Sequence, residues 1–596
     1  MLDERWKYRF KSGFLLKQLW SLLFLLIFFS ACSSPEQRLH QLFDAHWEYQ
    51  LEQNPLFATA QGDYRFNHLL PDPSIEAIYE RDQQYRQFLS ELSTIARDRL
   101  SRADQINYDI FWILLEQSIE ETELGAYRLP LNGWWDYHAV FADLPNRVPF
   151  RNQQHVEDYL NRLDQFPVYN QAYIERMRIG MEDGFIRPKV VFGDYVDSVT
   201  GLLRDNPDES QFFEPFRNLP AQITEEDAAD LKERARNIIQ ESVMKQLSYL
   251  ADFLNEEYIP ASAEREGIGF VPGGEEYYNY RIRYYTTLNL TAEEIHQTGL
   301  DEVQRIRTEM MEIVKEAGFD DDFDGFVHFL RTDPQFYAET PEQLMKKTTF
   351  VLKMMDGRLP ELFKTLPRLP YGIMEIPEHL APRTTTAYYS RGRADGTRAG
   401  FYAVNTYNLP SRPLYEVEAL SLHEAVPGHH LQIALQQELE NLPNFRTSAS
   451  FTAYVEGWAL YAERLGLEVG FYEDMYSNFG RLSYEMWRAL RLVVDTGLHA
   501  KGWSRQQAVD FMAENSALSL HNINAEVNRY IFWPGQALAY KIGEIKIREL
   551  RALAEQELGD SFDIRSFHDA ILLSGSVPLE VLEENILIWI SERSGE

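Results

Sequence analysis

The chain has 596 residues, a single cysteine and a formal net charge of −34 at pH 7. Such an excess of acidic groups makes nucleic acid and anionic lipid surfaces poor partners, and one cysteine excludes a disulfide within the monomer. The length allows several domains, yet we find no internal repeat at a fixed period and no low-complexity linker.

The first 31 residues have the layout of a bacterial signal peptide. Five basic residues precede the apolar run 19–29, which is too short to span a bilayer comfortably. The segment ends in Phe29-Ser30-Ala31-Cys32, and small residues before a cysteine resemble the lipobox of bacterial lipoproteins. We therefore expect acylation of Cys32 after cleavage, with residues 32–36 as the tether. An uncleaved anchor, or an ordinary signal with an incidental cysteine, is the alternative.

The residue after the predicted acylation site is Ser33. In the sorting rule for Gram-negative lipoproteins, serine at this position favours the outer membrane. We therefore expect the protein in the cell envelope, attached to the outer membrane by its lipid and facing the periplasm.

Helical patterns dominate the rest of the chain. Residues 37–270 are typical of helices joined by aromatic-rich loops such as 131–137, and we expect them to form one wall of a cleft. Residues 271–596 are expected to form the second region of one compact body. Helix starts are indicated by the capping box at 291–294 and by Thr340 followed by proline. The sequence therefore predicts a mainly α fold.

The main strand signal lies at residues 399–407. Phe401, Ala403 and Asn405 alternate there with Tyr402 and Val404, as expected for a half-buried strand. The segment precedes the most polar motif of the chain, so we expect a small β-sheet beside that motif.

Residues 423–430 read His-Glu-Ala-Val-Pro-Gly-His-His, which places three of the 14 histidines and a carboxylate within eight positions. Zinc takes imidazole nitrogen readily, and a catalytic zinc typically keeps three protein ligands and one position open for water. The motif therefore indicates a zinc site, with Glu424 placed to act on the bound water. Surface histidines on a polar helix are the alternative.

The spacing of the histidines leaves two choices for the second ligand. Pro427 interrupts the helix because it has no N–H to bond the His423 carbonyl and its ring would clash there. On a regular helix His430 would share the face of His423 but lie about 10 Å along the axis. A residue looped out at 427–428, as in a π-bulge, would instead bring His429 toward His423. We favour His423 with His429, and His430 is the alternative.

The third ligand is expected from a helix that includes residues 453–463. Glu456 lies there among apolar residues, and a charge on such a surface is costly unless it is paired or bound to metal. A structural salt bridge is the alternative. Glu463 lies two turns further on and could orient a ligand by a hydrogen bond.

These motifs resemble a bacterial family known as domain of unknown function 885. The resemblance covers most of the chain from about Gly273 onward, and it implies a helical zincin-like metallopeptidase fold, distantly similar to angiotensin-converting enzyme and the oligopeptidases. It further implies that residues 271–596 form the catalytic region, that a Glu on a later helix is the third zinc ligand, and that the histidine of Pro-Gly-His is His429. The segments that carry it are residues 422–432, 456–459, 492–503, 530–541, 567–568 and 575–579.

The predicted function is zinc-dependent hydrolysis of peptide bonds. Zinc held by His423, His429 and Glu456 would lower the pKa of bound water, and Glu424 would move the water proton to the leaving amine. A donor must also face the oxyanion. Tyr540 is the first choice, followed by Tyr530 and, as weaker candidates, His499 and His568.

Three further side chains are predicted to contact the substrate. In zincins, a strand just before the metal helix commonly offers its edge to an extended peptide, which would bring Asn405 to the substrate. An ordinary sheet position is the alternative for this residue. Lys541 and Arg548 could bind a substrate carboxylate, which would make the enzyme a carboxypeptidase.

Two other functions are compatible with these motifs. A zinc site could merely hold the fold of a binding or assembly lipoprotein, although Glu424 beside an open coordination position argues against this. The same zinc and base could also hydrolyse a non-peptide amide or ester, because the water chemistry is shared. The sequence leaves the oligomeric state open.

Overall fold

The structure, a computed structural model, describes residues 34–594 apart from 134–135, 379–380 and 382–383. The predicted signal peptide, Cys32 and Ser33 lie outside the described residues. Within the described part, the chain is mainly α with one three-stranded sheet, which confirms the predicted fold class. None of the helices in these ranges combines the length and the apolar character needed to cross a bilayer.

The first described helix, α2 (Pro35–Gln53), begins inside the segment predicted to be a tether. The Ser34 side chain accepts a hydrogen bond from the Gln37 amide, and the Gln37 side chain accepts one from the Ser34 amide. This capping box, with proline at the first helical position, starts the helix firmly. Residues 35 and 36 are therefore helical, and the prediction of a tether over 32–36 was wrong at its C-terminal end.

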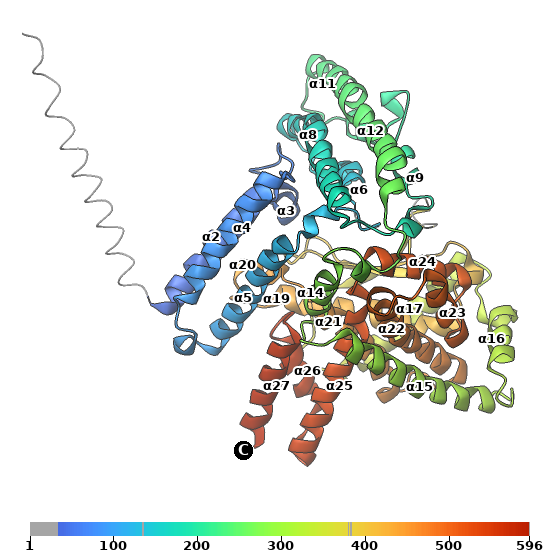
Figure 1. The fold of residues 1–596 in the computed structure, drawn as a ribbon. Coiled ribbons are helices and arrows are strands. Elements are labelled where there is room, and N and C mark those ends of the chain that lie inside the picture. Colours follow the sequence, from blue (N-terminus) through green and yellow to red (C-terminus); the bar gives the residue numbers. More distant parts are fainter. Residues whose placement is uncertain (1–33, 134–135, 379–380, 382–383, 595–596) are drawn as a thin grey trace, which may run out of the picture.

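The N-terminal half forms two helical groups, visible in blue and green in Figure 1. The first contains α2, α4 (Ile75–Ser93) and α5 (Arg102–Glu123), and the second contains α8 (Gln153–Asp183), α11 (Glu225–Ile238) and α12 (Lys245–Phe253). Both groups pack on the C-terminal half. The Phe43 and Phe445 rings lie 4.8 Å apart, and those of Phe192 and Phe532 lie 5.5 Å apart. Each of the two main hydrophobic cores thus draws residues from both halves.

Two helix pairs form the centre of the C-terminal half. Helix α15 (Ala292–Glu316) packs along α22 (Met475–Ala500), and α21 (Thr452–Leu465) packs along α25 (Ala539–Leu558). The starts predicted at Thr291 and Thr340 are confirmed, because each side chain caps its helix. Further helices of this half are α14 (Gly274–Thr286), α16 (Phe323–Thr332), α17 (Pro341–Leu362), α23 (Arg505–Asn515), α24 (Leu520–Phe532), α26 (Ile564–Leu572) and α27 (Leu579–Ser594).

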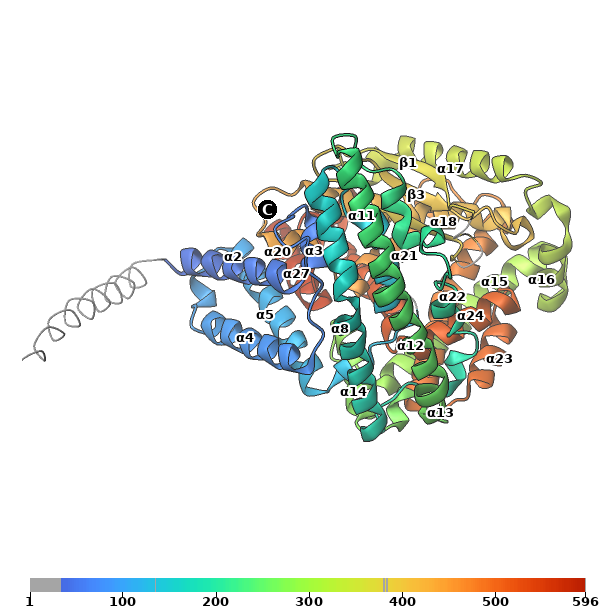
Figure 2. The ribbon, with the colours of Figure 1, turned by 90° about the horizontal axis from the view of Figure 1, so that it is seen from above.

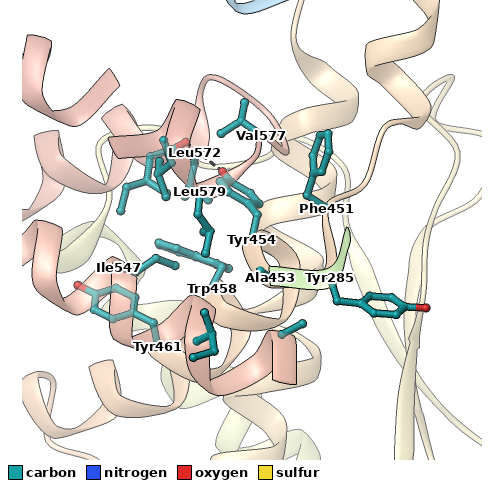
Figure 3. Packing of buried hydrophobic residues seen from close by; sticks show 14 of the residues in the cluster. Tyr285, Phe451, Ala453, Tyr454, Trp458, Tyr461, Ile547, Leu572, Val577 and Leu579 are labelled. Carbon is teal, nitrogen blue, oxygen red and sulfur yellow. Dashed lines mark hydrogen bonds between the residues drawn. The ribbon is translucent and has the colours of Figure 1, made fainter. Parts of the chain in front are cut away.

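Two glycines let α21 and α25 approach closely. A Cβ on Gly457 would meet the backbone of Gly543, and a Cβ on Gly543 would overlap the Ala453 carbonyl. On the same helices, Tyr454, Trp458 and Tyr461 of α21 pack with Ile547 of α25 in the surrounding core (Figure 3). The close crossing holds these two helices in a fixed relation.

The sheet has the order β1-β3-β2, with strands β1 (Tyr371–Glu375), β2 (Ala387–Ser390) and β3 (Gly400–Val404). The predicted strand is β3, which ends earlier than expected. Strand β3 pairs parallel with β1 and antiparallel with β2, so it is the central strand and both of its edges are already paired. The expectation that this strand offers an edge to substrate was therefore wrong, and the outer strands of the sheet are β1 and β2. Figure 2 shows β1 and β3 beside α17 and α18 (Val417–Glu424).

Candidate metal centre

The histidine motif spans a break between two helices. Helix α18 ends at Glu424 and α19 (His429–Glu438) begins after a gap of four residues, with a cis peptide between Val426 and Pro427. Wide hydrogen bonds close the turn, since the Gly428 amide donates to the Leu422 carbonyl and the His430 amide to the Ala425 carbonyl, at 2.9 and 3.0 Å. A Cβ on Gly428 would overlap the carbonyls of His423 and Leu422, which explains the glycine. The predicted bulge in one long helix is thus a full interruption.

This turn brings His429, and not His430, to His423. One ligand atom from each of His423, His429 and Glu456 lies within 4.8 Å of the other two. Oε2 of Glu456, on α21, lies 3.4 Å from Nε2 of His423 and 3.5 Å from Nε2 of His429. Two imidazole nitrogens and one carboxylate oxygen converging in this way are a donor set typical of catalytic zinc sites. The residues present therefore fit a zinc ion.

A hydrogen bond from the far side orients His423. Its Nδ1 lies 2.8 Å from Oε1 of Glu463. Glu463 is buried, and it lies two helical turns after Glu456 on α21. With Nδ1 donating to Glu463, Nε2 faces Glu456 and can offer its lone pair to a metal once its proton is lost. Burial lowers the pKa of His423, but Glu456 and Glu463 outweigh it and raise that pKa to about 9. Burial raises the pKa of Glu456, but His429 and His423 outweigh it and hold that pKa well below its usual value.

The neighbouring His430 points toward the sheet. Its Nδ1 lies 2.9 Å from the hydroxyl of Tyr389 on β2, and its ring lies 4.8 Å from that of Tyr371 on β1. Burial lowers the pKa of His430 to about 4. The side chain is thus a neutral link between α19 and the sheet, and it lies outside the metal cluster.

The three candidate ligands open onto a cavity of about 460 Å³. Glu424 lines its wall, and the Glu424 carboxylate makes no hydrogen bond or ion pair within the described part of the chain. Residues 385–389, at and before the free edge of β2, line another side. The cavity therefore combines a metal-binding cluster, an unengaged carboxylate and a strand edge.

Tyr540 also lines this cavity, from the first turn of α25. Burial and then the charge of Glu456 raise its pKa, so the hydroxyl remains protonated. The hydroxyl lies 3.4 Å from Nε2 of Gln536, and the Arg491 guanidinium lies 4.3 Å from the ring centre. These contacts leave a hydroxyl donor beside the cluster.

The other candidate donors have structural partners. The Tyr530 hydroxyl accepts hydrogen bonds from Trp487 and Arg491, both at 3.1 Å. Both ring nitrogens of His499 are engaged with backbone groups, and those of His568 lie within 2.9 Å of the Tyr461 hydroxyl and the Leu362 carbonyl. Tyr530, His499 and His568 therefore hold helices together.

The predicted substrate contacts Lys541 and Arg548 form ion pairs with glutamates of the protein instead. Lys541 is fully buried, and its Nζ lies within 2.9 Å of carboxylates of Glu302, Glu485 and Glu544. Arg548 lines a different cavity and lies 3.3 Å from Glu544. The prediction that these two residues bind a substrate carboxylate was wrong, because Lys541 is neutralised inside the core and Arg548 opens onto a cavity that lacks the candidate metal ligands.

Asn405 is also structural. Its side chain is fully buried, and Nδ2 lies within 3.0 Å of the carbonyls of Ala381, Thr384 and Thr385. Asn405 therefore holds the loop that precedes β2, and the prediction that it contacts substrate was wrong.

Three arginines in the cavity wall were missed from the sequence: Arg488 and Arg491 on α22, and Arg529 on α24. A signal was present. Tyr484, Trp487, Arg488 and Arg491 recur at spacings of three and four, which places them on one helix face. Arginines beside large aromatic residues on one face of a helix indicate a polar site.

Comparisons with known proteins agree with the motifs. The model of the family described as "Bacterial protein of unknown function (DUF885)" matches residues 55–586. No curated protein matches. A candidate lipoprotein from Colwellia psychrerythraea has 28% identity and a TM-score of 0.87, over 94% of this chain and 100% of that one. A candidate lipoprotein of unknown function from Shewanella oneidensis has 18% identity and a TM-score of 0.75, over 93% of this chain and 100% of that one.

A peptidase, PZ peptidase A with an inhibitor, is matched at 12% identity with a TM-score of 0.32, over 87% of this chain and 98% of that one. With the family model matching nearly the whole described chain, this protein belongs to the DUF885 family.

Proposed function

We propose that this protein is a zinc-dependent hydrolase of peptide bonds. The observation that carries the proposal is the convergence of His423, His429 and Glu456 in a cavity whose wall also bears the unengaged Glu424. Zinc bound by these three residues would polarise the scissile carbonyl and lower the pKa of a bound water. The chemistry then needs a base, a donor and a means of holding the peptide.

The chain supplies a residue for each of these tasks. Glu424 accepts the proton of the attacking water and delivers it to the leaving amine. The protonated Tyr540 hydroxyl donates a hydrogen bond to the oxyanion. The edge of β2 pairs with the backbone of an extended peptide, which brings the scissile bond into the cavity.

The ligand set favours hydrolysis over a purely structural zinc site. Structural sites usually close the metal with four protein ligands, whereas the cluster found among the described residues has three. It also faces about 460 Å³ of open space. A site that only held the fold would need neither the space nor Glu424.

We also propose that the protein is anchored by a lipid on Cys32 after cleavage of residues 1–31, at the outer membrane and facing the periplasm. The support is the lipobox-like Phe29-Ser30-Ala31-Cys32 and the match to two candidate lipoproteins. The peptide substrate would accordingly be met in the periplasm.

Metal content measured together with turnover tests the hydrolase. We expect about one zinc per chain by elemental mass spectrometry, and peptide hydrolysis that a chelator abolishes and added zinc restores. The panel should contain peptides, cell-wall amides and esters. Stoichiometric zinc without hydrolysis of any peptide would favour a binding protein, and turnover confined to the other compounds would favour a different hydrolase.

A further inference from the structure

The three arginines of the cavity wall have only two carboxylate partners within the described part of the chain. Arg491 and Arg529 both approach Oε2 of Glu526, at 3.2 and 2.9 Å. Arg488 lies 3.6 Å from Oε1 of Glu463, and this oxygen already accepts a hydrogen bond from His423. All three arginines are buried or nearly so, which makes incomplete neutralisation costly. We call Arg488, Arg491 and Arg529 the arginine wall.

Arg491 is both rigid and incompletely bonded. Its guanidinium lies 4.5 Å from the Trp487 ring and 4.3 Å from the Tyr540 ring, and Nε donates to the Tyr530 hydroxyl. Its buried Nη1 has no hydrogen-bond partner in the part of the chain that the structure describes. A buried N–H without a partner is unfavourable, and a planar guanidinium is suited to a carboxylate. A ligand group would satisfy it.

The charges of the cavity also favour an anion. Apart from tyrosines, the ionisable groups in its lining are three arginines, three glutamates and the two candidate histidine ligands. Behind the lining, Glu463 adds one negative charge beside His423 and Arg488. With the histidines neutral, as ligands are, a bound divalent ion would leave one positive charge in excess. The zinc-loaded cavity would thus be electropositive in a chain with a net charge of −34.

We propose that the arginine wall binds a carboxylate of the peptide substrate, with Arg491 as the main contact. This inference rests on the proposed function. Arg491 touches Tyr540, the residue assigned to the oxyanion, so the bound carboxylate lies close to the scissile bond. It belongs either to the C-terminus of the peptide or to an acidic side chain near the cleaved bond.

Binding to the zinc-loaded Glu424→Gln protein tests the proposal without turnover. Three fluorescein-labelled pentapeptide libraries are compared by anisotropy: free acids lacking Asp and Glu, the matching C-terminal amides, and amides with one fixed Glu. We expect one of the two carboxylate libraries to bind roughly 10- to 100-fold more tightly than the plain amides. Preference for the free acids identifies the C-terminus, and preference for the Glu library identifies a side chain. Equal binding of all three overturns the proposal.

Variants then locate the contact. Arg491→Gln should abolish the preference between libraries, and Arg491→Lys should retain only part of it because the two-pronged geometry is lost. Arg548→Gln is the matched control, since Arg548 lines another cavity, and it should keep the preference. Zinc content per chain checks that each variant is folded. Unchanged preference in a folded Arg491→Gln protein overturns the assignment.

The wild-type protein separates this inference from the proposed function. If it cleaves all three libraries at equal rates, the hydrolase stands and the arginine wall has no such role. If it cleaves none of them while the variant still prefers a carboxylate library, the carboxylate site stands and the hydrolase fails.

Discussion

The Nδ1 atom of His423 lies 2.8 Å from a carboxylate oxygen of Glu463, on the side of the ring opposite Glu456. The imidazole is therefore held between two carboxylates, one placed to share a metal with it and one placed to orient it. Partners of this second kind commonly matter for metal affinity nearly as much as the ligands do.

Replacing Glu463 should weaken zinc binding without removing a ligand. We expect Glu463→Ala to lower zinc affinity roughly 10- to 100-fold, because the His423 ring loses its orientation. Glu463→Gln should be milder, since the amide oxygen still accepts the Nδ1 hydrogen bond. Competition with a coloured chelator measures both. Equal affinity in all three proteins would mean that Glu463 has no part in metal binding.

Zinc and protons should compete for His423. Before zinc binds, the two carboxylates hold the pKa of His423 at about 9, so the imidazole is protonated at neutral pH. Zinc must displace that proton, and below about pH 9 its apparent affinity should fall about tenfold per pH unit. Calorimetry at pH 7.5 in buffers of different ionisation enthalpy should report about one proton released per zinc. No release would contradict the assignment, and Glu463→Gln should release less.

The raised pKa of His423 also makes the stability of the zinc-free chain depend on pH. Zinc affinity increases as the pH rises, whereas this stability decreases. The folded pKa of about 9 exceeds the ordinary value of 6.5, so protonated His423 stabilises the fold. This contribution is complete below pH 6.5 and is lost as the pH rises through 9. Zinc-free protein should therefore lose stability over this range, as thermal unfolding at several pH values would measure. A His423→Ala chain should lack the dependence.

The two adjacent histidines should differ sharply when replaced. His429→Ala removes one of the three converging nitrogen and oxygen donors, so bound zinc should fall to a small fraction. His430→Ala should keep most of its zinc, because His430 faces Tyr389. Elemental analysis after dialysis distinguishes the two. Zinc retained by His429→Ala but lost by His430→Ala would refute the arrangement.

Glu424→Gln should separate binding from chemistry. The amide has nearly the same shape but cannot accept the water proton, so peptide hydrolysis should fall by about 10²- to 10⁴-fold while zinc content persists. Steady-state rates and elemental analysis on the same samples give both numbers. Loss of zinc would make Glu424 a ligand, and full activity would place the base elsewhere.

Lipidation should depend on the only cysteine. Cys32→Ser should leave an uncleaved precursor that incorporates no labelled fatty acid, because the sulfur is the expected attachment point. Gel mobility and radiolabelling in a Gram-negative host report both. Normal processing and unchanged membrane partitioning would contradict the lipoprotein assignment.

Local rules predicted much of this structure. Capping residues marked the starts of α15 and α17, and the proline in the motif indicated that His429 would turn toward His423. These features depend on neighbours within a few residues, which a sequence displays directly.

The failures concern long-range packing. Lys541 follows Tyr540, yet its Nζ is neutralised by Glu302 and Glu485, which lie far away in the sequence. Asn405 follows a strand, but its amide is used by a loop some twenty residues earlier. The arginine wall likewise depends on how α22 and α24 face each other. Periodicity shows which residues share a face and leaves open what that face meets.

The division of roles between His429 and His430 couples the strand edge to the metal. A peptide paired with β2 would lie against the segment that holds Tyr389, whose hydroxyl meets His430. The residue that precedes His430 in the chain, His429, is a candidate zinc ligand. If peptide binding shifts this contact, zinc affinity changes with it. Thermodynamic reciprocity then requires zinc to alter peptide affinity by the same factor. Cofactor and substrate would act as effectors of each other through a single pair of neighbouring side chains.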